Sequence, residues 1–189
     1  MSTIALFGTS ADPPTHGHRA LLEGLLAHYP QVATWASDNP LKQHKAPLAM
    51  RTALLQALVE AIGDPRLSLE QQLSSPWAIE TLERARCRWP EREPVFVVGS
   101  DLVGQIPGWR QADRLLQNQR LAIAPRRGWP LQQADLDRLR AMGARLELLP
   151  LEVPASASSR IRQQVDPALV PQELLPLLLE HNHYGFPPP

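Results

Sequence analysis

Hydrophobic residues along the chain alternate between two kinds of segment. Short continuous apolar runs, typical of buried strands, cover residues 4–7, 31–37, 66–70, 94–101, 121–125 and 145–150. Segments with apolar residues at helical spacing lie between them, at residues 15–29, 48–63, 75–89 and 134–143. Two short helices near residues 159–164 and 172–181 complete the predicted set.

Several helical segments also carry recognisable ends. The first repeats apolar side chains at helical intervals and stops before Pro30; these side chains are Leu21, Leu22, Leu25, Leu26 and Tyr29. The second is rich in Ala and Leu and ends at Gly63. The third is predicted to begin with Ser75 as its N-cap and Pro76 in its first turn, with an apolar stripe of Ala78, Leu82, Ala85 and Trp89.

Alternation of strands and helices is typical of an α/β fold with a parallel sheet covered on both faces. We therefore predict a Rossmann-like, doubly wound parallel sheet in a single domain, residues 1–189, with a small helical part at its C-terminal end. The final residues, 185–189, include the run FPPP and are predicted to be a frayed tail. In such folds ligands bind where the carboxyl ends of strands meet a reversal of strand order, which directs attention to the loops after Phe7, Ser37, Val98 and Ala124.

Composition narrows the classes of protein. The chain has 189 residues, with 19 basic and 19 acidic side chains, so its formal net charge is zero. This balance argues against a general nucleic-acid binder. Cys87 is the single cysteine, which excludes an intrachain disulfide and fits a reducing compartment. The N-terminus lacks signal-peptide features and no apolar run reaches about 20 residues, so we expect a cytoplasmic protein without a membrane partner.

The segment GTSADPPTHGH, residues 8–18, lies where the first predicted strand should give way to a helix. Gly8 permits a sharp turn and close approach of a ligand, and Thr15 can cap the helix. Gly17 leaves the first helical turn without a side chain, so an anion can lie against the backbone N–H groups. His18 falls in the same turn and can donate a hydrogen bond to a phosphate. An ordinary proline-rich turn with two surface histidines fits the same residues, and the GxxxxGK(S/T) phosphate loop is absent.

This segment resembles the first signature of the nucleotidyltransferase superfamily with an (H/T)xGH motif. It is similar in particular to the GGTFDPIHxGH segment of bacterial nicotinate-nucleotide adenylyltransferases. Among its departures from that segment, Thr9 replaces a glycine, Ala11 a phenylalanine and Thr15 the first histidine.

Further segments resemble later motifs of the same family, in the same order, so that the resemblance covers residues 3–184. DNPLKQHK resembles the loop that brings a lysine to the phosphates, with Lys45 preferred and Lys42 second. VFVVGSDL resembles the GaD motif, and IPGWRQADRLL the f..W...e.Ll stretch. SASSRIR, residues 156–162, resembles ISSTxIR, and ELLPLLLEHNHYG resembles the C-terminal helix that ends in a tyrosine.

Two motifs match less closely. SSPWAIETLERA resembles SYTxdTL, but Trp77 stands for the tyrosine and Ala78 for the threonine. LAIAPRRGWP resembles the vv.RpG strand and turn, which places Arg126 and Arg127 near the site.

The resemblance implies roles for individual side chains. The implied catalytic residues are His18, Lys45 and Arg162. The implied ATP-binding residues are Gly8, Thr9, Ser10, Thr15, Gly17, His18, Gly99, Asp101, Ser158, Ser159 and Arg162. The implied mononucleotide-binding residues are Asp12, Lys45, Ala78, Trp109 and Arg110, with Trp109 stacking on the pyridine ring.

Each of these residue types also has a purely structural interpretation. Lysines are usually solvated, an aspartate often caps a helix, and a tryptophan is commonly part of a core. Arg110 fits an ordinary surface arginine, and a serine-capped helix with an arginine is common in every fold class.

The reaction implied by the resemblance joins ATP and nicotinate mononucleotide to give deamido-NAD and pyrophosphate. A mononucleotide phosphate oxygen attacks the α-phosphorus in line, so neither a base nor a covalent enzyme intermediate is required. Catalysis then rests on positioning and on positive charge around the leaving pyrophosphate. We expect Mg²⁺ to accompany ATP, held mostly by phosphate oxygens and water, with no protein-held metal.

Alternatives at this point are adenylyltransferases that use phosphopantetheine or nicotinamide mononucleotide, and a non-catalytic nucleotide sensor. A nucleic-acid role is not expected. The sequence leaves open whether the chain forms a homo-oligomer.

Overall fold

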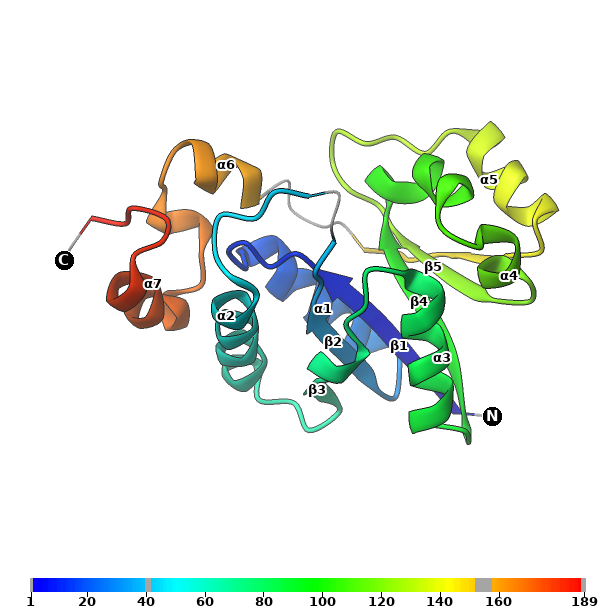
Figure 1. The fold of residues 1–189 in the computed structure, drawn as a ribbon, viewed down its shortest axis with the longest axis horizontal. Coiled ribbons are helices and arrows are strands. Elements are labelled where there is room, and N and C mark those ends of the chain that lie inside the picture. Colours follow the sequence, from blue (N-terminus) through cyan, green and yellow to red (C-terminus); the bar gives the residue numbers. More distant parts are fainter. Residues whose placement is uncertain (1, 40–41, 152–157, 188–189) are drawn as a thin grey trace.

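The structure, a computed structural model, describes residues 2–39, 42–151 and 158–187. Six parallel strands form one sheet in the order β3-β2-β1-β4-β5-β6 (Figure 1). The strands are β1 (Ser2–Thr9), β2 (Val32–Ala36), β3 (Leu67–Leu69), β4 (Arg92–Gly99), β5 (Arg120–Ala124) and β6 (Arg145–Leu148). The predicted α/β architecture is therefore confirmed.

Helices connect the strands along the chain. The α-helices are α1 (His16–His28), α2 (Leu48–Ile62), α3 (Ala78–Arg88), α4 (Ala112–Leu116), α5 (Gln133–Ala141), α6 (Ser158–Gln163) and α7 (Leu175–His181). The 3₁₀ segments are η1 (Gln71–Leu73), η2 (Ser100–Gly108), η3 (Pro167–Leu169) and η4 (Gln172–Leu174). Neither η2 nor α4 follows from the hydrophobic pattern, since each is too short or too irregular to show helical periodicity.

The sheet separates two hydrophobic cores because side chains alternate between its faces. On β1, Ala5 and Phe7 face the core formed with α1, α2 and the C-terminal helices. Ile4 and Leu6 face the core formed with α3, η2, α4 and α5. Burial on both faces explains why the strand segments read as continuous apolar runs.

Strand order reverses between β1 and β4, which are neighbours in the sheet although β2 and β3 lie between them in sequence. The chain moves outward from β1 to β3, then returns to β4 and proceeds to β6. The loops that leave Thr9 and Gly99 therefore diverge at the same edge, where a doubly wound sheet opens a ligand-binding crevice.

The start of α3 differs from the prediction. Trp77, not Ser75, occupies the N-cap position. Ser75 lies two residues earlier, where its hydroxyl accepts a hydrogen bond from the Trp77 N–H at 3.2 Å and donates to Glu80 at 2.5 Å. The helix begins later because its first backbone bond runs from the N–H of Thr81 to the carbonyl of Trp77.

The C-terminal end also differs from the predicted tail. Phe186 is only 2% exposed and packs edge-on against Tyr184, with ring centroids 6.5 Å apart. The amide of Asn182 donates to the carbonyl of Phe186 at 3.1 Å. Because two aromatic rings are buried here, the segment before Pro187 packs against the domain, beside α2 and α7 (Figure 1).

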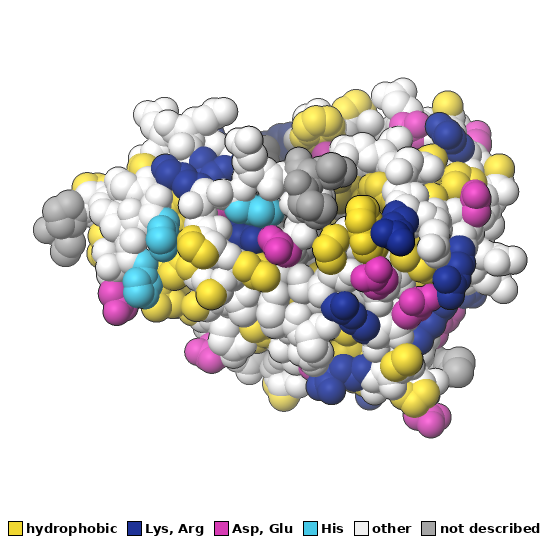
Figure 2. Space-filling view, in the orientation of Figure 1, with side chains coloured by type: hydrophobic (Ala, Val, Ile, Leu, Met, Phe, Trp, Pro, Cys, Tyr) yellow, Lys and Arg dark blue, Asp and Glu magenta, His cyan; other side chains and the backbone are white. Residues whose placement is uncertain are grey.

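The surface carries charges of both signs. On the face shown in Figure 2, Lys and Arg side chains are interspersed with Asp and Glu instead of forming one basic surface. Within residues 2–39, 42–151 and 158–187, no helix combines the length and the apolar character that crossing a membrane requires.

Gly8 owes its identity to packing within the fold. It lies inside β1, paired with Trp35 of β2, and does not itself form the predicted sharp turn. A Cβ atom at Gly8 would lie 2.5 Å from the indole ring of Trp35, which is almost completely buried. Glycine is therefore required at this position because any side chain would collide with the Trp35 indole, whether or not a ligand also approaches.

We predict that Gly8→Ala destabilises the protein by about 1–3 kcal/mol, because the added methyl group overpacks the buried indole. Urea unfolding of the two proteins measures the difference. Gly108→Ala is the matched control, since nothing lies within 4 Å of a Cβ at Gly108. Equal stability of the Gly8→Ala variant and the wild type would contradict this account.

Candidate active site

The loop between β1 and α1 ends in a cap that holds His18. Thr15 is the N-cap of α1 and forms a capping box with His18, as its predicted capping role requires. The Thr15 N–H donates to Nδ1 of His18 at 3.1 Å, and the Thr15 hydroxyl lies 2.9 Å from the same nitrogen. Gly17 is buried in the first turn between them. Histidine thus fills the position that glutamate or glutamine usually takes in such a cap.

This cap determines which ring nitrogen of His18 carries the proton. Nδ1 accepts from a backbone N–H, so the proton of the neutral ring resides on Nε2. Burial, together with the smaller effect of the nearby positive charge of Arg126, lowers the pKa of His18 to about 4. His18 is therefore neutral at physiological pH. It therefore offers a neutral N–H donor.

Asp12 is the centre of the loop's hydrogen-bond network. Its buried carboxylate accepts from the N–H of Lys45 at 2.8 Å, the N–H of Ala46 at 3.1 Å and the hydroxyl of Tyr184 at 2.7 Å. Burial by itself would raise the pKa of Asp12, but these three donors and the Arg162 guanidinium outweigh it and hold the pKa below its usual 3.8. Both oxygens accept hydrogen bonds from the protein, so Asp12 has a scaffolding role in the structure, and its contact with the mononucleotide stays a prediction.

The start of α6 is attached to the same loop. The Ser158 hydroxyl donates to the carbonyl of Pro13 at 2.8 Å, and Arg162 donates to the carbonyl of Asp12 at 2.8 Å. Ser159 is exposed beside them. The structure thus brings Arg162 and His18 to one loop, although they are far apart in sequence. Residues 156 and 157 of the motif lie outside the described residues.

Lys45 approaches this loop from the β2–α2 connection. Its backbone is held by Asp12, its side chain is exposed, and Nζ lies 3.4 Å from the carbonyl of Tyr184. An exposed ammonium on a fixed backbone can move to a bound anion at little cost. Lys42, the second choice, is exposed on the same connection.

The edge of β4 carries a second set of predicted residues. Asp101 lies in the first turn of η2, and its Oδ2 pairs with Arg126 at 2.9 Å. Its Oδ1 is buried and has no hydrogen-bond partner among the described residues. A Cβ at Gly99 would collide with this carboxylate, so glycine is required beside it. An unsatisfied buried acceptor is costly unless a ligand donor completes it.

An aromatic side chain and a cationic side chain, Trp77 and Arg110, lie together between the end of η2 and the start of α3. The guanidinium of Arg110 lies 4.9 Å from the ring centroid of Trp77, a cation–π contact. Ala78, the next residue, begins α3, and Trp109 is partly buried against the core on this side of the sheet. The structure therefore joins Arg110 to the start of α3 through Trp77, which the sequence analysis treated only as a departure from the family motif.

Two arginines outside the predicted catalytic and binding residues organise the site. Arg51 is buried and donates to the carbonyls of Ser10, Ser37 and Ala46, so it joins the loops after β1 and β2. Arg126 forms an ion pair with Asp101, and its positive charge lowers the pKa of His18. The resemblance of LAIAPRRGWP to the vv.RpG motif had placed Arg126 near the site, whereas Arg51 lies on a helix without any distinguishing motif.

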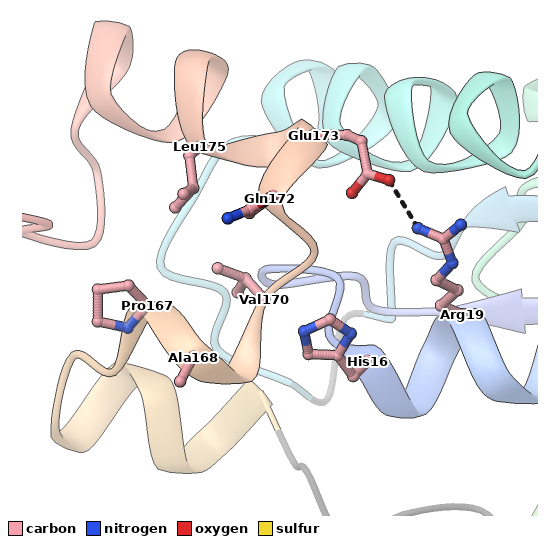
Figure 3. Close-up of a pocket in the computed structure, with 8 residues that line it drawn as sticks. All are labelled: His16, Arg19, Pro167, Ala168, Val170, Gln172, Glu173 and Leu175. Carbon is pink, nitrogen blue, oxygen red and sulfur yellow. Dashed lines mark hydrogen bonds and ion pairs between the residues drawn. The ribbon is translucent and has the colours of Figure 1, made fainter.

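Neither a metal cluster nor the clearest cavity coincides with these residues. Over the described ranges, no three His, Cys, Asp or Glu side chains lie close enough together to hold a metal ion. A cavity of about 550 Å³ lies between the start of α1 and residues 167–175, lined by His16, Arg19, Pro167, Ala168, Val170, Gln172, Glu173 and Leu175 (Figure 3). None of the predicted site residues lines it, and its arginine is paired with Glu173.

The loop after β1 and the loop after β4 lie where the strand order of a doubly wound sheet reverses, and sequence comparison defines the class of the protein. A family model described as cytidylyltransferase-like matches residues 6–164, from β1 to the end of α6.

Relatives narrow the class further. A protein of Synechocystis sp. described as a probable nicotinate-nucleotide adenylyltransferase is 39% identical, over 96% of this chain and 98% of that protein. One from Gemmatimonas aurantiaca with the same description is 32% identical, over 86% of this chain and 80% of that protein. The chain belongs to this family, the nicotinate-nucleotide adenylyltransferases, within the cytidylyltransferase-like proteins.

Solved structures show the same fold. The Plasmodium falciparum nicotinic acid mononucleotide adenylyltransferase complexed with NaAD superimposes with a TM-score of 0.80 at 17% identity, and 99% of each chain is covered. The Plasmodium falciparum enzyme complexed with APC gives a TM-score of 0.76 at 16% identity. The predicted Rossmann-like fold is thus confirmed independently of sequence similarity.

The neutral state of His18 predicts how stability depends on pH. The folded-state pKa of about 4 lies below the ordinary 6.5, so the unfolded chain binds more protons between these values. This contribution to the free energy of unfolding is present above 6.5 and is lost as pH falls toward 4. From about pH 7 to about pH 5, the wild type should lose about 2 kcal/mol more than His18→Gln, whose amide does not titrate. Urea unfolding at both pH values measures this; equal losses in the two proteins would contradict it.

Proposed function

We propose that this protein transfers the adenylyl group of ATP to nicotinate mononucleotide, releasing pyrophosphate and forming deamido-NAD. The observation that carries the proposal is the convergence of two distant segments on one loop: His18 is capped by Thr15, and Arg162 is bound to Asp12. The chain's family and the substrate named for its relatives supply the reaction.

ATP lies, in this proposal, across the edge between β1 and β4. Its phosphates accept from the Nε2–H of His18, from backbone N–H groups of residues 8–10 and 17, and from Ser158, Ser159 and Arg162. Helix α1, with 13 residues, adds the partial positive charge of its N-terminus. Helix α6 has six residues, so its contribution comes from individual donors more than from an aligned dipole. The ribose hydroxyls donate to Asp101, whose buried Oδ1 has no hydrogen-bond partner among the described residues.

The acceptor nucleotide lies between the β2–α2 connection and η2. Lys45 binds its phosphate. Trp109 and the Arg110–Trp77 pair face the pyridine ring, where the guanidinium can meet the nicotinate carboxylate. Ala78 contributes backbone and shape only. Asp12 acts indirectly, by holding the backbone of Lys45.

The reaction follows from this placement. A phosphate oxygen of the mononucleotide attacks the α-phosphorus of ATP, the bond to the β-phosphate oxygen breaks, and pyrophosphate leaves. The nucleophile is an anion, so no side chain needs to remove a proton. His18, Lys45 and Arg162 stabilise the charge that develops on the leaving group. Mg²⁺ would enter with ATP, and phosphate oxygens and water would supply its ligands.

We predict that nicotinate mononucleotide supports the fastest release of pyrophosphate from ATP. The experiment offers the purified protein nicotinate mononucleotide, nicotinamide mononucleotide, phosphopantetheine or no acceptor, and measures pyrophosphate continuously. The expected order places nicotinate first because Arg110 complements its carboxylate. Preference for phosphopantetheine, or ATP binding without turnover of any acceptor, would overturn the proposal in favour of a sister enzyme or a nucleotide sensor.

We predict that His18→Ala lowers kcat about a hundredfold while the KM for the mononucleotide changes little, because one preorganised donor to the transition state is lost. His16→Ala is the matched control: His16 is two residues away, exposed, and lines the cavity of Figure 3 instead of the loop. Its kcat should stay near that of the wild type. Unchanged turnover in His18→Ala would remove this residue from the mechanism.

A further inference from the structure

Thr9 contacts the ring nitrogen of His18 that the cap leaves as a donor. Its hydroxyl oxygen lies 2.9 Å from Nε2, and the side chain is only 9% exposed. Thr9 and Thr15 are two of the positions at which the segment departs from the family pattern it resembles, and the side chains of both hydrogen-bond the imidazole. The departures are therefore coupled in space.

The direction of each bond follows from the partners. Because Nδ1 accepts from the Thr15 N–H, Nε2 carries the proton and donates it to the Thr9 oxygen. The N–H of Ala11 donates to the same oxygen at 3.3 Å. Thr9 Oγ1 thus accepts twice, and its own hydrogen must point away from both donors. Thr9 itself is fixed, since it ends β1 paired with Ala36.

We propose that Thr9 is a positioning residue for the adenylyl transfer: it holds the imidazole of His18 with Nε2–H directed across the end of β1 before ATP arrives. This proposal rests on the proposed function and concerns the orientation of its main phosphate donor. Both ring nitrogens are bound, so the ring has one orientation. In the absence of ATP the Nε2–H donates to Thr9, and a bound phosphate then replaces or shares the Thr9 oxygen as its acceptor. Because the ring is already oriented, it loses less entropy in this exchange, which favours the transition state more than ground-state binding.

Three substitutions test this role. Thr9→Val keeps the shape and removes the oxygen, Thr9→Ser keeps the oxygen, and Thr9→Gly restores the residue of the resembled motif. We expect Thr9→Val and Thr9→Gly to lower kcat about tenfold, the equivalent of one net hydrogen bond, with less than about a threefold change in the KM for ATP. Thr9→Ser should recover most of the activity.

Thr34→Val is the matched control. Thr34 is also buried near the same edge, but its hydroxyl donates to the carbonyl of Phe7 at 2.8 Å and does not contact His18. This variant should lose stability without a change in kcat. If it lowers kcat as much as Thr9→Val does, the effect is general destabilisation and the proposal fails.

Two further measurements separate positioning from structure. In the His18→Ala background, Thr9→Val should lower kcat no further, because the group it positions is absent; a second tenfold loss would overturn the proposal. NMR of the ligand-free wild type and Thr9→Ser should show a slowly exchanging Nε2–H of His18, which Thr9→Val loses. The NMR result does not depend on which acceptor is used. Persistence of that signal in Thr9→Val refutes the positioning bond even if the adenylyl transfer is established, whereas its loss supports the bond even if the acceptor proves to be different.

Discussion

A buried carboxylate at Asp12 is the interaction on which the rest of the site depends. An ionised side chain removed from water must be surrounded by donors, and Asp12 finds them in the N–H groups of Lys45 and Ala46 and the hydroxyl of Tyr184. Its own carbonyl holds Arg162. The need to satisfy one residue therefore draws the β2–α2 connection, α6 and the C-terminal segment onto the loop that follows β1.

Arg51 is a buried positive charge that satisfies backbone acceptors, whereas Asp12 is a buried negative charge that is satisfied by donors. Its buried guanidinium donates to three carbonyls in two loops, which would otherwise lack partners at the crowded edge of the sheet. Together the two buried charges make irregular backbone rigid without regular secondary structure. This rigidity gives His18, Lys45 and Arg162 defined starting positions, as phosphoryl-type transfer by positioning requires.

His18 illustrates how local structure selects a chemical state. In a capping box the third helical residue accepts from the N-cap backbone, and here an imidazole does so. The cap therefore determines the tautomer, burial determines the neutral state, and the neutral ring presents one N–H. A charged imidazolium would gain more from a phosphate, but it would cost more to keep beside Arg126 in the absence of the nucleotide.

How much could be predicted from the sequence depended on the range of the interaction. The strands and long helices could be predicted from periodicity, because burial on one or both faces of an element sets which nearby positions are hydrophobic. The Thr15 cap followed from local chemistry. By contrast, the scaffolding role of Asp12, the contribution of Trp77 to the Arg110 group, and the buried end at Phe186 involve partners remote in sequence, which leave no local pattern.

The sequence by itself thus determined the alternation of elements, the capped helix after β1 and the family resemblance, since each depends on residues within a few positions of one another. Only the tertiary structure decided that β1 and β4 are neighbours, that α6 is attached to the first loop, and that Thr9 and Thr15 hold one imidazole from both sides. The physical reason is that satisfying buried charges and ring nitrogens depends on distance in space, and distance in space is set only when the sheet has assembled.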